Sequence, residues 1–168
     1  MSASALVSTA TLLTFVVLVF SAAVSDIRSF TVPNRVCLAV VLLYPAFVAS
    51  ATHPVAWAPA LAVAAAALLL GFLLFAVGAW GGGDAKLFAA AALWAGPEFI
   101  IPLTVFTTLA GGVMAIFIWL QHRLSRAPVA AMMLHVEADP DVGKQPMPYG
   151  AAIAVGALYV AFTLLKVN

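Results

Sequence analysis

Long apolar runs separated by short polar segments dominate this chain. Six of them are roughly as long as the 17 to 25 residues that a membrane-spanning helix requires. These runs cover approximately residues 5–24, 33–51, 57–79, 85–101, 103–121 and 148–167. The pattern predicts an all-α, polytopic bundle of about six transmembrane helices.

Two of the predicted helices contain residues that break or bend a helix. The second run opens with Pro33, which a first helical turn accepts, and has Pro45 inside, where we expect a kink. The fourth run is interrupted by Gly96, Pro97 and Glu98. We therefore expect the fourth helix to be short, tilted or re-entrant.

The composition excludes a soluble globular domain. Of 168 residues, 65% are hydrophobic and 8% are charged, and the mean hydropathy is +1.16. A soluble domain is nearer half apolar and a quarter charged. Six spans with short connections leave no room for a second unit, so residues 1–168 are interpreted as one integral-membrane domain. The net charge of +1 argues against nucleic acid as a partner.

The first apolar run is interpreted as a retained helix rather than a secretory signal. Small residues follow it at 21–23, but no Lys or Arg precedes it and it is long enough to span a bilayer. Cys37 is the only cysteine, which excludes a disulfide framework and a four-cysteine zinc site. We expect Cys37 to be a small buried hydrophobic residue.

The basic residues predict the orientation in the membrane. If every run crosses, the segments before the second, fourth and sixth runs share one side. Six of the seven Lys and Arg residues lie in those segments: Arg28, Arg35, Lys86, Arg123, Arg126 and Lys144. The positive-inside rule places this side in the cytoplasm and both termini in the periplasm, with Lys166 as the exception. Trp80 and Trp119 then lie at the inner interface, and Trp57 and Trp94 at the outer one.

Small residues allow membrane helices to approach one another closely. Two alanine-rich stretches, Ala62–Ala67 and Ala89–Ala92, are candidates for such contacts. In a chain this rich in alanine, filler is an equally good interpretation of either stretch.

Two aspartates at helix ends carry the candidate chemistry. Asp26 ends the first helix and Asp84 begins the fourth, and an ionisable residue in such a place is a functional candidate. Because the second and third helices cross out and back, both aspartates lie on the same face of the membrane. Gly81, Gly82 and Gly83 allow a peptide backbone to approach the second aspartate. On the local sequence alone, a helix N-cap is an equally good interpretation of Asp84. The structural alternative for Asp26 is a turn residue.

Two carboxyl groups within hydrogen-bond reach cannot both ionise cheaply, so they share a proton. One can then activate a water molecule while the other donates a hydrogen bond to a carbonyl oxygen, which is the chemistry of an aspartic protease. The alternative is a small proton-coupled transporter or channel component in which the same acids relay protons. Such a relay predicts acids at the midplane of the bilayer.

Three segments resemble the prepilin peptidases: DIRSFTVPN at 26–34, GGGDAKLFAA at 81–90 and PYGAAIAVG at 148–156. The likeness is greatest to the small inner-membrane form that serves Flp/Tad-type pili, the CpaA/TadV group. The resemblance implies that Asp26 and Asp84 are the catalytic pair and that no cofactor is needed. It also implies prepilin substrates, cut at the cytoplasmic face between a short basic leader and an apolar helix.

Other residues of these segments are expected to support the active site or the substrate: Arg28, Pro33, Asn34, Gly81, Gly82, Gly83, Lys86, Pro148, Tyr149 and Gly150. For Lys86, steadying the negative charge of the pair and snorkelling toward lipid headgroups are equally good interpretations. Larger prepilin peptidases carry two Cys-x-x-Cys pairs associated with methylation of the product, and this chain lacks them. Presenilin-like proteases share a glycine-aspartate signature, but their other motifs are absent here.

The remaining polar residues give weaker signals. Glu98 is expected on the outer side, away from the aspartates. His53, His122 and His135 stand singly, which does not favour a metal site. The loop over residues 122–147 becomes acidic at its end, with Glu137, Asp139 and Asp141. These acids either attract the basic leader of a substrate or belong to a solvated loop. The pattern predicts no oligomeric state.

Overall fold

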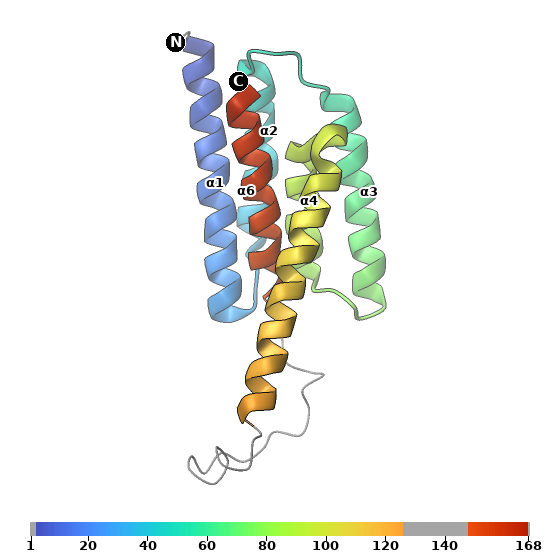
Figure 1. Ribbon diagram of the computed structural model, residues 1–168. Helices are drawn as coiled ribbons and strands as arrows, with labels where there is room; N and C mark the ends of the chain where they lie inside the picture. The colour runs from blue at the N-terminus through green and yellow to red at the C-terminus, as the bar shows by residue number, and fades with distance from the viewer. Residues whose placement is uncertain (1–2, 126–147, 168) are drawn as a thin grey trace.

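A computed structural model describes residues 3–125 and 148–167, which form a bundle of helices without strands (Figure 1). The helices are α1 (Ala3–Ser29), α2 (Asn34–Ser50), α3 (Trp57–Ala76), α4 (Gly82–Ser125) and α6 (Tyr149–Val167). By length and composition, α1, α3, α4 and α6 can each cross a membrane, and α2 is a shorter apolar helix. The predicted all-α, polytopic membrane bundle is confirmed.

Some sequence candidates lie outside the described residues. They all belong to residues 126–147: Arg126, His135, Glu137, Asp139, Asp141 and Lys144. Their predicted parts in orientation and in attraction of a basic leader therefore stay predictions.

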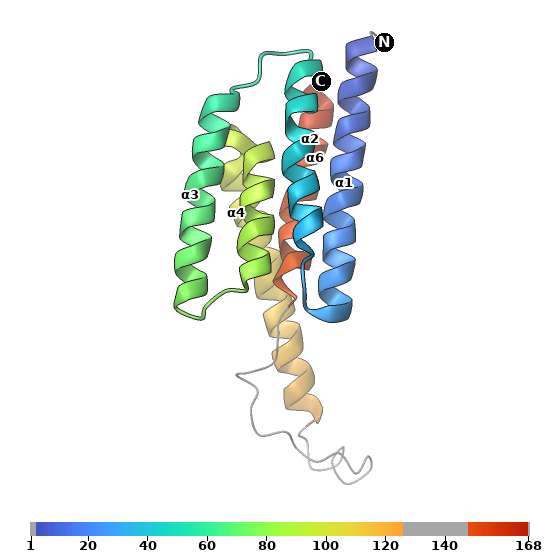
Figure 2. The same cartoon turned by 180° about the vertical axis from the view of Figure 1, so that it is seen from behind.

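Helix α4 consists of two arms joined by a reversal at Gly96. Gly96 has φ 56° and ψ −167°, a backbone conformation that glycine adopts readily because it lacks a Cβ atom. The arm over residues 82–95 is shorter than the roughly 20 residues of a full span, and the arm over 97–125 runs back beside it (Figures 1 and 2). The expected shortness of the fourth helix is confirmed.

The predicted boundary between the fourth and fifth helices, at residue 102, is wrong. Pro102 lies inside the second arm. It removes only the hydrogen bond to the carbonyl of residue 98, in the first turn of that arm, so the helix continues through it. The reversal falls instead at Gly96, where the positive φ is accessible.

The connections between helices gather at two ends of the bundle. Residues 26–34, 77–84 and 148–150 lie together at one end, here called the aspartate end (Figure 1). Residues 51–56 and 96–98 lie at the other, here called the Gly96 end, where both termini of the described chain also lie. Helix α4 packs against α2, α3 and α6, and α1 packs against α2 and α6.

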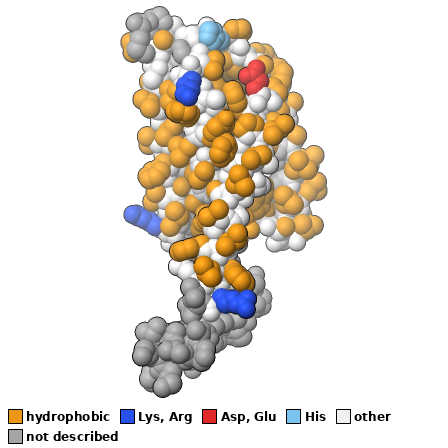
Figure 3. Space-filling model, in the orientation of Figure 1, with side chains coloured by type: hydrophobic (Ala, Val, Ile, Leu, Met, Phe, Trp, Pro, Cys, Tyr) orange, Lys and Arg blue, Asp and Glu red, His pale blue; other side chains and the backbone are white. Residues whose placement is uncertain are grey.

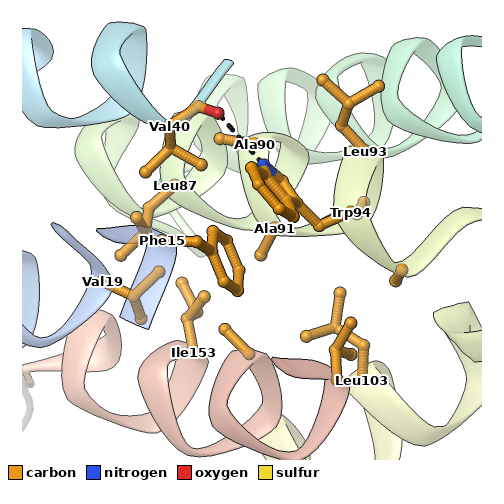
Figure 4. Close-up of a cluster of buried hydrophobic side chains, with 14 of the residues drawn as sticks. Phe15, Val19, Val40, Leu87, Ala90, Ala91, Leu93, Trp94, Leu103 and Ile153 are labelled. Carbon is orange, nitrogen blue, oxygen red and sulfur yellow. Dashed lines mark hydrogen bonds between the residues drawn. The ribbon is translucent and has the colours of Figure 1, made fainter. Parts of the chain in front are cut away.

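The first arm of α4 forms the centre of the core. Leu87 and all residues of Ala89–Ala95 are buried. The Trp94 ring stacks on Phe15 of α1 with centroids 4.4 Å apart, and its Nε1–H donates a hydrogen bond of 3.0 Å to the carbonyl of Val40 in α2 (Figure 4). Trp94 is therefore not a residue of the predicted outer belt, because these contacts hold it in the core at 3% exposure.

The two alanine-rich stretches have different roles. Ala89–Ala92 is buried on all sides, so its small side chains let four helices approach one another. Within Ala62–Ala67 of α3, only Ala67 is buried. The close-contact interpretation holds for the first stretch and the filler interpretation for most of the second.

The outside of the bundle is apolar. Large hydrophobic side chains such as Leu69, Leu70 and Phe72 of α3 are exposed, and hydrophobic atoms cover most of the face in Figure 3, where charged side chains are few. A surface of this kind suits lipid rather than water. Cys37 is buried, as expected.

Candidate active site

Asp26 is held at the aspartate end by the beginning of α6. It lies in the last turn of α1 and is 3% exposed. Its Oδ2 atom accepts a hydrogen bond of 2.7 Å from the backbone N–H of Gly150, the second residue of α6. A Cβ atom on Gly150 would lie 2.8 Å from this oxygen and 3.0 Å from the Cβ of Asp26. Only glycine allows the two helices this contact.

Asp84 lies in the first turn of α4 and is 8% exposed. Its carboxyl group lies against the backbone of Gly81, where a Cβ atom would come within 2.6 Å of Oδ2. The free N–H groups at a helix N-terminus favour a carboxylate in this place. Asp84 is the third residue of α4, so the N-cap position that one sequence interpretation gave it belongs instead to Gly81, whose carbonyl accepts the first helical hydrogen bond from the N–H of Ala85.

The two aspartates share one cavity of about 480 Å³ at the aspartate end. They are close enough to interact electrostatically, and the Gly150 backbone N–H faces both carboxyl groups. Two acids that are distant in the sequence thus meet beside the same helix N-terminus. Paired carboxyl groups that share one proton can act as a base and an acid on a single water molecule.

Three segments form the walls of this cavity: the α1–α2 connection, the α3–α4 connection and the start of α6. The lining residues are Asp26, Phe30, Thr31, Val32, Asn34, Gly78, Ala79, Trp80, Gly81, Gly82, Gly83, Asp84 and Tyr149. Among the described residues that line it, only the two aspartates are formally charged. A cavity with this lining attracts cationic rather than anionic groups.

Lys86 does not simply extend toward headgroups. Its exposed Nζ donates a hydrogen bond of 3.0 Å to Oδ1 of Asn34, the first residue of α2. The first turn of α4 also approaches the α1–α2 connection closely, since a Cβ atom on Gly83 would lie 3.2 Å from the Cβ of Val32. These contacts join the two segments that carry the aspartates.

Three other predicted support residues do not line the cavity. Arg28 is exposed on the last turn of α1. Pro33 precedes α2, and its carbonyl accepts a hydrogen bond of 3.0 Å from the N–H of Val36. The carbonyl of Pro148 accepts a bond of 3.2 Å from Ala151 at the start of α6. Each of these prolines stands directly before the first residue of a helix.

The cavity also has apolar walls, which include Phe30 and Trp80 and which no sequence motif predicts. Phe30 directly follows α1 and has φ 50°, a left-handed conformation that is uncommon outside glycine, and its side chain is half exposed. Trp80 packs against Phe88, with ring centroids 5.5 Å apart. The polar stretch before Pro33 does mark the end of a helix, but no local signal says which aromatic ring faces the aspartates.

Glu98 lies far from this site. It lines a separate cavity of about 150 Å³ at the Gly96 end, together with His53. The expectation that Glu98 does not reach the aspartates is confirmed. Within residues 3–121 and 148–167, no three His, Cys, Asp or Glu side chains are grouped so that they could hold a metal ion.

The fold and the site define an integral-membrane protein with a pair of buried carboxyl groups at one end of its bundle. The family model described as type IV leader peptidase matches residues 13–116, which include both aspartates. The match covers more than half of the chain, so the chain belongs to the type IV leader peptidase family. No curated protein and no solved structure matches it. Membership confirms the resemblance to prepilin peptidases and makes the chain a membrane-bound peptidase.

Proposed function

We propose that this protein is an aspartic endopeptidase that removes the leader from prepilins with Asp26 and Asp84 as its catalytic pair. The observation that carries the proposal is the meeting of these two buried acids in one cavity, beside the Gly150 amide. Burial of two carboxyl groups is costly, and a fold retains such a pair at a functional site.

In the proposed mechanism, a water molecule binds between the two carboxyl groups. The ionised carboxylate takes a proton from it as the water oxygen attacks the carbonyl carbon of the scissile peptide bond. The protonated partner donates its proton toward the carbonyl oxygen. When the tetrahedral intermediate collapses, the C–N bond breaks and the leaving nitrogen takes the proton that the first carboxylate received from water. The second carboxylate recovers its proton from a hydroxyl group of the intermediate. A carboxylic acid and an amine are released, and the pair again holds one proton.

The Gly150 amide contributes by holding Asp26. Its N–H bond to Oδ2 fixes the direction of the carboxyl group. The positive end of the α6 helix dipole also stabilises negative charge at this point. Precise placement of this kind lowers the barrier because the reacting groups need no further ordering.

We further propose that the site faces the cytoplasm and that the substrate is a prepilin of the Flp/Tad type. Arg28, Arg35 and Lys86 belong to the aspartate end, and Lys166 to the opposite end, as the positive-inside rule requires for this orientation. A cavity in which two acids are the formally charged members of the described lining suits a basic leader. The apolar outer surface next to it suits the apolar helix that follows the leader.

The positions of the two acids do not favour the transporter interpretation. A proton relay needs acids near the midplane of the bilayer. Asp26 lies in the last turn of α1, and Asp84 in the first turn of α4.

The test is leader cleavage in cells that express the protein together with a prepilin. Asp26→Asn and Asp84→Asn should each lower the cleavage rate on the order of 10²- to 10⁴-fold, the usual contribution of a general acid or base. Membrane fractionation checks that each variant is still inserted. Normal cleavage by either inserted variant would overturn the proposal. Cleavage of a type IV prepilin but not of a Flp prepilin would overturn only the substrate assignment.

A further inference from the structure

The Lys86–Asn34 hydrogen bond determines which end of the Asn34 side-chain amide faces Lys86. The bond joins residues that are 52 positions apart, and Asn34 itself lines the cavity of the aspartates. A lysine ammonium group has three hydrogen-bond donors and no acceptor. The amide oxygen of Asn34 must therefore face Lys86, and the Nδ2 group is the end that remains for other partners.

A peptide in this cavity needs donors as well as acceptors. The two aspartates are occupied with the water and the scissile carbonyl in the proposed mechanism. Carbonyl groups on either side of the scissile bond are hydrogen-bond acceptors, and leaving them unpaired in a partly buried site costs free energy. Asn34 is exposed where it lines the same cavity, and its Nδ2 group is a neutral donor that the hydrogen bond from Lys86 to Oδ1 leaves available.

We propose that Asn34 binds a backbone carbonyl of the substrate through Nδ2, and that Lys86 is the positioning residue that orients it. The inference rests on the proposed peptidase function and extends it. A competing role for the pair is purely structural, in which the hydrogen bond only ties the start of α2 to the start of α4.

Asn34→Asp separates these roles. Aspartate has nearly the same shape and keeps an oxygen for Lys86, so the tie between the helices is preserved or strengthened. The same change replaces the donor with an acceptor. If Asn34 binds a substrate carbonyl, KM for a purified prepilin should rise about tenfold, the equivalent of one lost hydrogen bond. Asn34→Leu, which removes the donor without adding charge, should give a similar rise in KM with kcat within about twofold.

Lys86 should act only through Asn34. Lys86→Met leaves the amide free to flip, so we expect a smaller rise in KM, by a few-fold, and no additional effect when Asn34→Leu is already present. Lys86→Arg keeps a charged hydrogen-bond donor at this position, so its KM should equal that of the wild type. Lys166→Met, the same chemical change at the opposite end of the bundle, is the matched control and should leave KM unchanged.

Two results would overturn this inference. A wild-type KM for Asn34→Asp would mean that the pair is only structural. A larger loss for Lys86→Met than for Asn34→Leu would mean that Lys86 acts directly on the substrate or the aspartates. Failure of the proposed function is distinguishable, because it appears as retained cleavage in Asp26→Asn or Asp84→Asn, whatever the Asn34 variants do. Thermal unfolding of each variant in detergent checks that the variant is folded under the conditions in which KM and kcat are measured.

Discussion

Both ends of the bundle combine a cavity with an acidic residue near the start of a helix, but they hold the acid differently. At the aspartate end, Asp26 and Asp84 come from separate helices, are buried, and face each other beside the Gly150 amide. At the Gly96 end, Glu98 is exposed at the start of the second arm of α4. The ends resemble each other in sequence pattern, and they differ in burial and in pairing.

This difference shows what distinguishes a candidate catalytic acid from an ordinary turn residue. A buried carboxylate loses its hydration and needs hydrogen bonds in return, whereas an exposed one keeps its water. The fold supplies the backbone of Gly81 to Asp84 and that of Gly150 to Asp26. Glu98 is exposed and keeps its hydration, so its surroundings do not indicate a catalytic role.

The largest difference between the two ends is expected when their acids are replaced. Asp26→Asn and Asp84→Asn act on one shared unit, so the double variant should lose no more cleavage than either single variant, on the order of 10²- to 10⁴-fold. Glu98→Gln should cleave prepilin at the wild-type rate. A loss for Glu98→Gln comparable with the aspartate variants, measured as kcat/KM, would remove the distinction between the two ends.

The next largest effect is expected at Gly150. Gly150→Ala places a Cβ atom 2.8 Å from the Asp26 Oδ2 atom, so either the carboxyl group or the start of α6 must shift. Misplacement of a reacting group by about 1 Å costs up to about 100-fold, and we expect kcat/KM to fall about 10- to 100-fold. The control is Gly111→Ala, where the new Cβ atom meets Ala152 at an ordinary 3.7 Å. Equal activities for the two variants would contradict the tight contact.

A smaller effect is expected at Gly81. The nearest atom to a new Cβ there is the Asp84 Oδ2 at 2.6 Å, the far end of a side chain that can rotate. We therefore expect Gly81→Ala to lower kcat/KM by about tenfold at most, less than Gly150→Ala, since backbone need not move. A larger loss for Gly81→Ala would mean that the placement of Asp84 is the more demanding of the two.

The smallest effect on activity is expected at Gly96, where strain rather than contact limits the residue. A Cβ atom there would meet only Ala60, at 3.6 Å, but alanine is disfavoured at φ +56°. Gly96→Ala should lower the free energy of unfolding by about 1 to 3 kcal/mol and leave kcat unchanged. Thermal unfolding in detergent and the cleavage assay measure the two quantities. A loss of kcat in the folded variant would show that the two ends are coupled.

Some features of the fold follow from local sequence properties. Apolar length predicts the membrane helices, and the number of crossings between Asp26 and Asp84 places both at the same end. The paired acids could therefore be proposed from the sequence, together with the glycines beside them. Gly96 could be identified as a break, although not as the point where α4 reverses.

Length, hydropathy and the alternation of crossings are properties of the linear chain. They are enough to predict the membrane class, the number of apolar segments and the common end of the two aspartates. Three features depend on how the helices pack: Trp94 lies in the core, Ala89–Ala92 but not most of Ala62–Ala67 is buried, and the Gly150 amide meets Asp26. The physical reason is that these helices are apolar all round. No hydrophobic period marks their inner faces, so rotation and close contact are set by packing between helices.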